Sequence, residues 1–449
     1  MADGGAADPA ALTAREALAA MAAGRLTSAD LVAACLARID ATEGALGAWV
    51  HVDRAGAMRT AEALDAHRRR GLPVGPLHGL PVGVKDIVDV AGLPCARGSP
   101  QDRGRVAQTD ATVVRRLRAA GGIVLGKTVT TELASYPPPP TANPHAADRT
   151  PGGSSSGSAA AVAAGHVPLA LGTQTNGSIV RPASFCGTVG YKPTYGAVAR
   201  SGVMPFAPAT DTLGLLARSV EDCVLLEHLS GPDGVDTDAL PHTMALSARA
   251  LEAPPLTPVF GFFEGPAWAE AEPALRDALQ ELLAALPGTR HIATPAALAD
   301  SATMLRRIMA AESAHHLGGY LDRDPVGLHP VLAEMFREGR ALSATLYLAA
   351  RASQPRLAAA FDPVFEEVDA LITPAAPGEA PSRDSTGSPS FCSLWSLTGL
   401  PAVSLPLLVG PAGLPIGVQL VGPRGDDARL LRTARWLVRH LAARQEDAA

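Results

Sequence analysis

Two short polar stretches in the middle of the chain combine hydroxyl groups with glycine. Residues 152–158 (GGSSSGS) are followed at once by an alanine-rich run, so we expect a buried helix that begins with free backbone, hydroxyls and a positive helix end. Residues 173–178 (TQTNGS) follow the apolar run 169–171 and present Ser178 at the end of a predicted strand. Successive backbone N–H groups in such a loop can form an oxyanion hole, which is a feature of acyl-transfer chemistry.

Lysine is rare in this chain, and its scarcity singles out three positions. Of the 38 Lys and Arg residues, only Lys85, Lys127 and Lys192 are lysine. Arginine serves wherever a generic cation is needed, whereas a lysine can lose its proton when it is removed from water. Lys85 lies in a segment dense in Val and Ile, and we expect it to be buried there.

Two other motifs match known patterns without their structural context. Residues 121–128 match the G-x4-G-K-T pattern of a phosphate-binding loop, but residues 123–125 are expected to be the strand itself. Residues 153–157 match G-x-S-x-G, which would make Ser155 a nucleophile on a strand-to-helix elbow. The segment before this motif is a polar loop that ends in Pro151. We therefore expect neither nucleotide binding nor an elbow serine.

The composition describes a folded chain of 449 residues, with 47% hydrophobic and 18% charged residues. A net charge of −6 argues against a protein that binds nucleic acid or an anionic membrane through its overall electrostatic field. The N-terminus lacks the basic and apolar regions of a secretory signal, and no uninterrupted apolar run is long enough to cross a membrane. Five scattered cysteines without a CxxC pair, and histidines without ligand spacing, predict no disulfide framework and no metal site. A reducing cytoplasm is the expected location.

The elements that must position these residues follow from the hydrophobic patterning. An N-terminal helical layer is predicted, followed by strand-like runs that alternate with helices and favour an α/β sheet. We predict helices at 8–22, 28–43, 53–70, 111–120 and 158–164, and strands at 80–90, 123–125 and 167–171.

The second half of the chain is predicted to be mostly helical before it returns to strands. One strand (258–263) and helices at 271–286, 301–318 and 341–367 precede strands at 370–373, 402–408 and 416–421 and a helix at 426–440. Without a repeat or a long polar linker, we expect one large domain spanning 1–449. Its regions are a helical layer (about 1–75), a catalytic core (about 76–230), a variable helical elaboration (about 231–370) and a C-terminal part that completes the sheet (about 371–449).

These motifs closely resemble the amidase signature family. The serine-rich stretch of the family is represented by residues 152–158 and 173–182, and it continues through Cys186-Gly187 and residues 190–194. Further matches lie at 79–86, 125–128, 211–214 and 219–222, with weaker ones at 397–402 and 413–419. The resemblance therefore covers nearly the whole chain. It implies a single α/β domain in which a mixed central sheet is covered by helices on both faces.

The resemblance also implies a Ser, cis-Ser, Lys catalytic triad. By position, Ser178 is the nucleophile, Ser154 relays the proton behind a cis Gly153–Ser154 peptide, and Lys85 is the base. The implied oxyanion hole consists of the N–H groups of Thr175, Asn176, Gly177 and Ser178, with Ser155 as a supporting hydroxyl and no metal or cofactor. The chemistry requires a neutral lysine, which burial favours over the protonated form with its ordinary pKa of about 10.4.

The sequence departs from the commoner family pattern around the nucleophile. Asp, Gly and Arg are usual where Gln174, Asn176 and Val180 stand, and the cation is displaced to Arg181. In some members that hydrolyse small carboxylated amides, an Arg three residues after the nucleophile binds the substrate carboxylate, and its planar fork suits that group. Two roles for Arg181 stay open here: substrate binding, or structural pairing with a loop carboxylate.

We expect a cytoplasmic amidase that hydrolyses a small or medium carboxamide to a carboxylate and ammonia or an amine, through a Ser178 acyl-enzyme. The alternative is the amidase subunit of a tRNA-dependent glutamine amidotransferase, whose partner binds tRNA and ATP. A catalytically silent scaffold is disfavoured because all three catalytic positions are filled. The expected partner is a small-molecule amide, without direct nucleic-acid or membrane binding, and a homodimer is left open.

Overall fold

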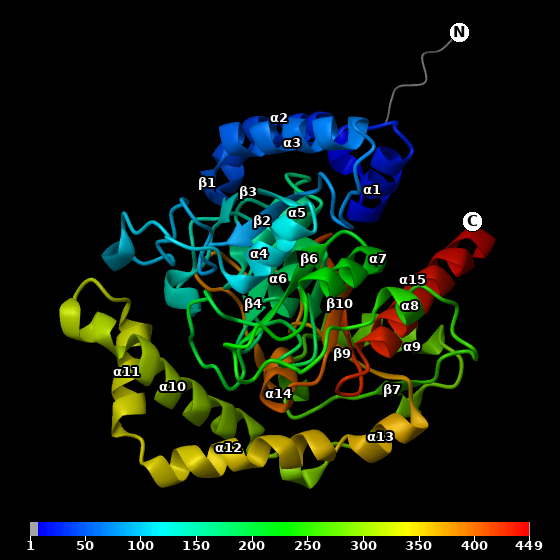
Figure 1. Cartoon of the computed structure of the whole chain (residues 1–449). Coiled ribbons are helices and arrows are strands. Elements are labelled where there is room, and N and C mark those ends of the chain that lie inside the picture. Colours follow the sequence, from blue (N-terminus) through cyan, green and yellow to red (C-terminus); the bar gives the residue numbers. More distant parts are fainter. Residues whose placement is uncertain (1–7, 449) are drawn as a thin grey trace.

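An 11-stranded mixed sheet runs through the middle of the molecule (Figure 1). The computed structural model describes residues 8–448. Strands follow one another in space as β1-β3-β2-β4-β6-β5-β10-β11-β9-β7-β8. Their bounds are β1 Trp49–Val52, β2 Pro81–Lys85, β3 Ile123–Thr128, β4 Leu169–Gln174, β5 Val189–Lys192, β6 Thr212–Ala217, β7 Phe260–Phe262, β8 Arg290–His291, β9 Ala370–Pro374, β10 Ala402–Val409 and β11 Pro415–Val421.

The central strands carry the site, and their pairing fixes where it lies. β2 pairs in parallel with both β3 and β4, whereas β4, β6, β5, β10, β11 and β9 pair in antiparallel fashion. Every residue of β2, β3, β4 and β6 is buried, as expected for strands that are covered on both faces. The mixed α/β architecture predicted from the sequence is confirmed.

Helices cover the sheet and extend beyond its ends. In Figure 1, α1 to α3 lie at one end of the molecule and α10 to α12 at the other. The helices are α1 Ala14–Ala22, α2 Ser28–Leu46, α3 Arg54–Arg69, α4 Thr112–Ala119, α5 Ser156–Ala163, α6 Val180–Cys186, α7 Val220–Cys223, α8 Ser247–Ala250, α9 Pro273–Ala284, α10 Ser301–Arg323, α11 Pro330–Ala341, α12 Ala344–Ala359, α13 Asp362–Glu367, α14 Ser390–Thr398 and α15 Asp427–Ala448.

Several boundaries differ from the sequence predictions. The predicted helix 8–22 begins with a 3-10 turn at Pro9–Ala11, and the first seven residues of the predicted helical layer lie outside the described residues. The predicted helix 341–367 was wrong as a single element. It is two helices, α12 and α13, and Pro363 stands in the first turn of α13, where a missing N–H costs nothing. Among the elements that were not predicted are the helix α11 and the strands β1, β5 and β6.

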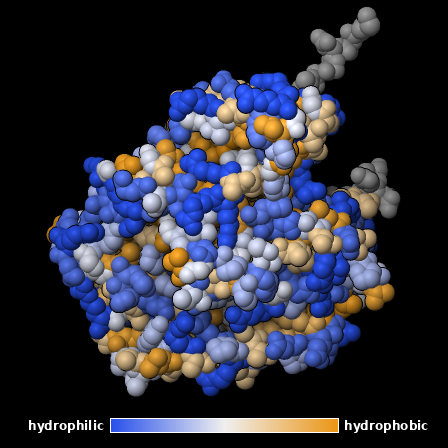
Figure 2. Space-filling view, in the orientation of Figure 1, coloured by the Kyte–Doolittle hydropathy of each residue, from blue (hydrophilic) through white to orange (hydrophobic). Residues whose placement is uncertain are grey.

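One contiguous hydrophobic core joins the N-terminal layer, the sheet and the α10 to α12 helices, and among the described residues only Phe185, Ala376 and Ala380 form a separate buried cluster. The face shown in Figure 2 mixes polar and apolar residues without a single dominant apolar surface. Within residues 8–448, no helix is both long enough and apolar enough to cross a membrane.

Candidate active site

Lys85 ends β2 and lies at the centre of a buried polar cluster. Its side chain is fully buried. The Nζ atom donates hydrogen bonds to Ser154 Oγ (2.7 Å), to Thr173 Oγ1 (2.8 Å) and to the Thr173 carbonyl (3.4 Å). Burial holds the pKa of Lys85 well below its ordinary value; nearby Asp211 opposes this effect and Arg181 adds to it. A neutral amine within hydrogen-bonding distance of a serine hydroxyl can act as a base.

Ser154 lies in the turn that leads into α5, after a cis Gly153–Ser154 peptide bond. Its carbonyl accepts the Thr131 N–H (3.3 Å). The next residue, Ser155, joins this turn to two other parts of the site. The Ser155 N–H donates to the Ser178 carbonyl (3.3 Å), and its hydroxyl exchanges hydrogen bonds of 3.2 Å with the main chain of Thr173. The sequence stretch rich in Gly and Ser is therefore an ordered, buried turn.

The next two serines of the turn bind the main chain. Ser156 Oγ donates to the Gly152 carbonyl (2.7 Å), and Ser158 Oγ donates to the Leu171 carbonyl (3.0 Å). Neither hydroxyl caps the N-terminus of α5, and the N-cap residue Ser155 makes no side-chain cap either. The Ser158 hydroxyl thus joins α5 to β4, and the Ser156 hydroxyl closes the turn before α5.

Ser178 lies in the loop between β4 and α6. Its side chain borders a narrow crevice that is also lined by Tyr136, Asn176 and Arg181. In the part of the chain that the structure describes, the four N–H groups predicted for the oxyanion hole have no hydrogen-bond acceptor, namely those of Thr175, Asn176, Gly177 and Ser178. Free N–H groups beside a hydroxyl nucleophile are what an oxyanion hole requires.

The structure gives Arg181 three hydrogen bonds that the sequence did not predict. The residue is 3% exposed, and its guanidinium donates to the carbonyls of Gly153 (2.6 Å) and Gly387 (2.7 Å) and to Thr386 Oγ1 (3.4 Å). No carboxylate among residues 8–448 forms an ion pair with it, so the structural pairing with a loop carboxylate is not found. Burial lowers the pKa of Arg181. Its Nε atom is buried and has no hydrogen-bond partner among residues 8–448.

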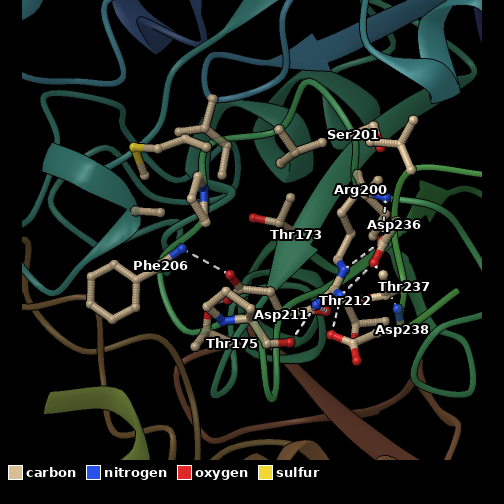
Figure 3. Close-up of a pocket in the computed structure, with 18 residues that line it drawn as sticks. Thr173, Thr175, Arg200, Ser201, Phe206, Asp211, Thr212, Asp236, Thr237 and Asp238 are labelled. Carbon is tan, nitrogen blue, oxygen red and sulfur yellow. Dashed lines mark hydrogen bonds and ion pairs between the residues drawn. The ribbon is translucent and has the colours of Figure 1, made fainter. Parts of the chain in front are cut away.

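A larger cavity of about 290 Å³ (Figure 3) adjoins the crevice, and Ala134, Thr175 and Phe206 line both. The cavity also reaches Thr173, whose hydroxyl contacts Lys85. On its far side, Arg200 forms ion pairs with Asp236 (2.9 Å) and Asp238 (2.8 Å). The cavity can accommodate the part of a substrate that extends from the reacting group.

Asp211 stabilises the wall between the cavity and the loop that carries Ser178. Its carboxylate accepts the Thr175 hydroxyl and the N–H groups of Phe206 (2.8 Å) and Ala207 (3.0 Å). Sequence reasoning placed Asp211 in a family motif without giving it a role. Thr173, Gln174 and the α14 serines Ser393 and Ser396 were also missed as site residues, and no local pattern marks the two α14 serines.

The other two lysines do not enter the site. Lys127 forms a fully buried ion pair with Asp86 (3.0 Å), which explains it as a structural cation at the end of β3. Lys192 is buried, and its Nζ atom donates to the Pro193 carbonyl (3.1 Å). All five cysteines are buried and free. No group of three potential metal ligands occurs among the described residues.

A buried Lys–Ser pair, a second serine in a loop bonded to it and N–H groups without acceptors are the groups that acyl transfer to a serine needs, and the comparisons with known proteins identify the family. The chain matches the family described as Amidase over residues 30–431, so it belongs to that family. It is 37% identical to a glutamyl-tRNA(Gln) amidotransferase subunit of Chloroflexus aggregans, over 94% of each chain. The family acts on C–N amide bonds.

Solved structures of similar proteins share the fold of this chain. The peptide amidase of Stenotrophomonas maltophilia has a TM-score of 0.82 at 29% identity, over 96% of each chain. A second structure has a TM-score of 0.90 at 31% identity, over 96% of this chain and 99% of the other. It is described as "An unexpected vestigial protein complex reveals the evolutionary origins of an s-triazine catabolic enzyme" with an inhibitor bound.

Proposed function

We propose that this protein hydrolyses a small or medium carboxamide through an acyl-enzyme on Ser178, with Ser154 as proton relay and Lys85 as base. The observation that carries the proposal is the 2.7 Å hydrogen bond between Lys85 Nζ and Ser154 Oγ, in a buried cluster whose turn is bonded to the Ser178 loop. The free N–H groups of that loop supply the oxyanion hole.

During acylation, protons move from Ser178 through Ser154 to Lys85. As Ser178 Oγ attacks the amide carbon, its proton passes to Ser154 Oγ, and the Ser154 proton passes to neutral Lys85. The carbonyl oxygen takes the negative charge and is bound by the N–H groups of the loop. When the C–N bond breaks, the leaving nitrogen takes a proton back through Ser154. Water then attacks the acyl carbon by the same route and releases the carboxylate and Ser178.

Single replacement of Lys85, Ser154 and Ser178 by Ala tests this assignment. We expect each folded variant to lose at least about 10³-fold in kcat/KM, measured as ammonia or acid release from a panel of amides, esters and dicarboxylic monoamides. Labelling by a fluorophosphonate should be lost in Ser178→Ala. Ser382→Ala is a matched control because its exposed hydroxyl donates only to Asp384 among the described residues, away from the site. Normal turnover in all three variants would end the proposal.

A preference for carboxylate-bearing amides is a finer part of the proposal. It is supported by a buried guanidinium that lines the crevice at Ser178, has no carboxylate partner among residues 8–448 and keeps its Nε atom free. A substrate carboxylate would neutralise this charge and accept from it.

Arg181→Ala separates this role from its structural one. Because Arg181 also donates to Gly153 and Gly387, the change should lower kcat for every amide. Only acidic amides should also show a KM that rises at least about tenfold. An equal change in KM for acidic and neutral amides of the same size would remove the substrate role.

The second candidate is the amidase subunit of a tRNA-dependent amidotransferase, which the similarity to the Chloroflexus aggregans protein supports. Purified protein that hydrolyses amides alone favours the first proposal. Glutamine-dependent transamidation that appears only with a co-expressed partner, tRNA and ATP favours the second. In both cases the same serine should be labelled, so the partner requirement is the measurement that separates the two.

A further inference from the structure

Gln174 connects the two ends of the loop 175–179, which carries Ser178 and is called the nucleophile loop here. It is the last residue of β4 and is fully buried. Its Oε1 atom accepts the N–H groups of Ile179 (2.9 Å) and Val180 (3.0 Å), which stand where the loop enters α6. Its Nε2 atom donates to Ser396 Oγ (3.1 Å) on α14. One neutral amide therefore closes the loop and ties it to a helix from the far end of the chain.

Ser396 links Gln174 to the loop by a second hydrogen bond. A hydroxyl has a single proton, and Ser396 donates it to the carbonyl of Asn176 while its lone pair accepts from Gln174. The chain of donors thus runs in one direction, from the Gln174 amide through the Ser396 hydroxyl to the Asn176 carbonyl. One turn earlier on α14, Ser393 Oγ donates to Asn176 Oδ1 (2.6 Å).

Holding the Asn176 carbonyl also orients the next N–H group. In a planar trans peptide, the carbonyl of Asn176 and the N–H of Gly177 point in opposite directions. Because the carbonyl is bound to α14, the Gly177 N–H must point away from that helix. Gly177 is packed tightly against α14, since a Cβ there would lie 3.0 Å from Pro389 Cβ and 3.1 Å from Cys392 Cβ. The loop has little room to tilt.

We infer that Gln174, acting through Ser396, is a positioning residue that orients the N–H groups of the oxyanion hole. This inference rests on the proposed function. In this chain the side chain at position 174 accepts two N–H groups and donates to Ser396, which an amide can do and a carboxylate cannot. A carboxylate at position 174 would accept the N–H groups but would also compete for the Ser396 proton, because hydrogen bonds to a charged acceptor are the stronger ones. The Asn176 carbonyl would then lose its donor.

Ser396→Ala and Gln174→Glu break the chain of donors at different points. In both variants we expect kcat for the fastest amide substrate to fall about 10- to 100-fold with KM changed by less than threefold, since the oxyanion exists only during the reaction. Affinity for a trifluoromethyl ketone analogue, which forms an oxyanion on the nucleophile, should fall by the same factor as kcat. Affinity for the product carboxylate should not change in Ser396→Ala, which adds no charge to the site.

Thr398→Val is the matched control because it removes a buried hydroxyl from α14 whose only hydrogen bond among the described residues is to the Leu394 carbonyl (2.8 Å). Ser396→Thr retains the hydroxyl and should retain kcat. The inference is overturned if Ser396→Ala turns over within twofold of Thr398→Val, or if affinity for ketone and product falls equally. If Ser396→Ala does not fold, the fall of kcat in Gln174→Glu relative to Thr398→Val decides alone, because the new carboxylate also repels the product. A wild-type protein without amidase activity would instead remove the proposed function.

Discussion

At the scale of single residues, Lys85 shows how burial and hydrogen bonding act against each other. Three acceptors surround Nζ, namely Ser154 Oγ, Thr173 Oγ1 and the Thr173 carbonyl, and together they could satisfy the three protons of an ammonium. Burial favours the neutral amine and prevails, since the pKa of Lys85 lies well below its ordinary value. The same cluster can therefore hold the amine in either protonation state during turnover.

Thr173→Val tests this balance. The change removes one acceptor of the ammonium, so the pKa of Lys85 should fall further, because a lost hydrogen bond to the charged form disfavours that form. The acid limb of kcat/KM, where Lys85 becomes protonated and inactive, should move to lower pH by about one unit. Thr173→Ser keeps the hydroxyl and should leave the limb in place. A pH profile of the Val variant that overlies the wild-type profile would contradict this account.

At the scale of elements, the strands and helices that a local hydrophobic pattern determines could be predicted from the sequence. The apolar runs before Lys85, before Lys127 and before Thr173 became β2, β3 and β4, and the alanine-rich run after the serines became α5. The contacts of α14 could not be predicted, because Ser396 meets Asn176 across 220 residues of sequence. The short β5 and α6 also lack the length that a periodic pattern needs.

The helix α5 also requires a glycine that composition alone would assign to flexibility. A Cβ on Gly157 would lie 2.1 Å from the Ala48 carbonyl oxygen and 2.4 Å from the Val129 backbone nitrogen. Both are main-chain atoms, so Gly157→Ala should destabilise the fold by about 3 kcal/mol. Gly44→Ala, in α2 with no atom within 4 Å of the new Cβ, should be neutral or stabilising. Equal midpoints of urea unfolding for the two variants would contradict the packing argument.

At the scale of the whole molecule, the sheet brings both halves of the sequence together around buried cations. β5 pairs with β10, so Lys192 lies opposite Ala402. Burial lowers the pKa of Lys192 to about 7, and a nearby Asp427 opposes the shift. Lys192 has no role in the site and forms no ion pair among the described residues. Its protonation therefore depends on the global fold that buries it.

This buried amine should make global stability depend on pH. Between about pH 7 and pH 10.4, the unfolded chain holds a proton on Lys192 that the folded chain has lost. Folding therefore releases a proton in this window, so the free energy of unfolding contributed by Lys192 rises with pH and is lost as pH falls toward 7.

Lys192→Met isolates this contribution, because other titrating groups cancel in the difference between the two proteins. The free energy of unfolding of the wild type, measured by urea titration, should gain about 2 kcal/mol relative to the variant between pH 7.5 and pH 9.5. Lys192→Arg retains a permanent charge and should be less stable than the wild type at pH 9.5, because the burial cost of the cation is then never relieved. A constant difference between wild type and Lys192→Met across this range would show that Lys192 keeps its proton in the folded protein.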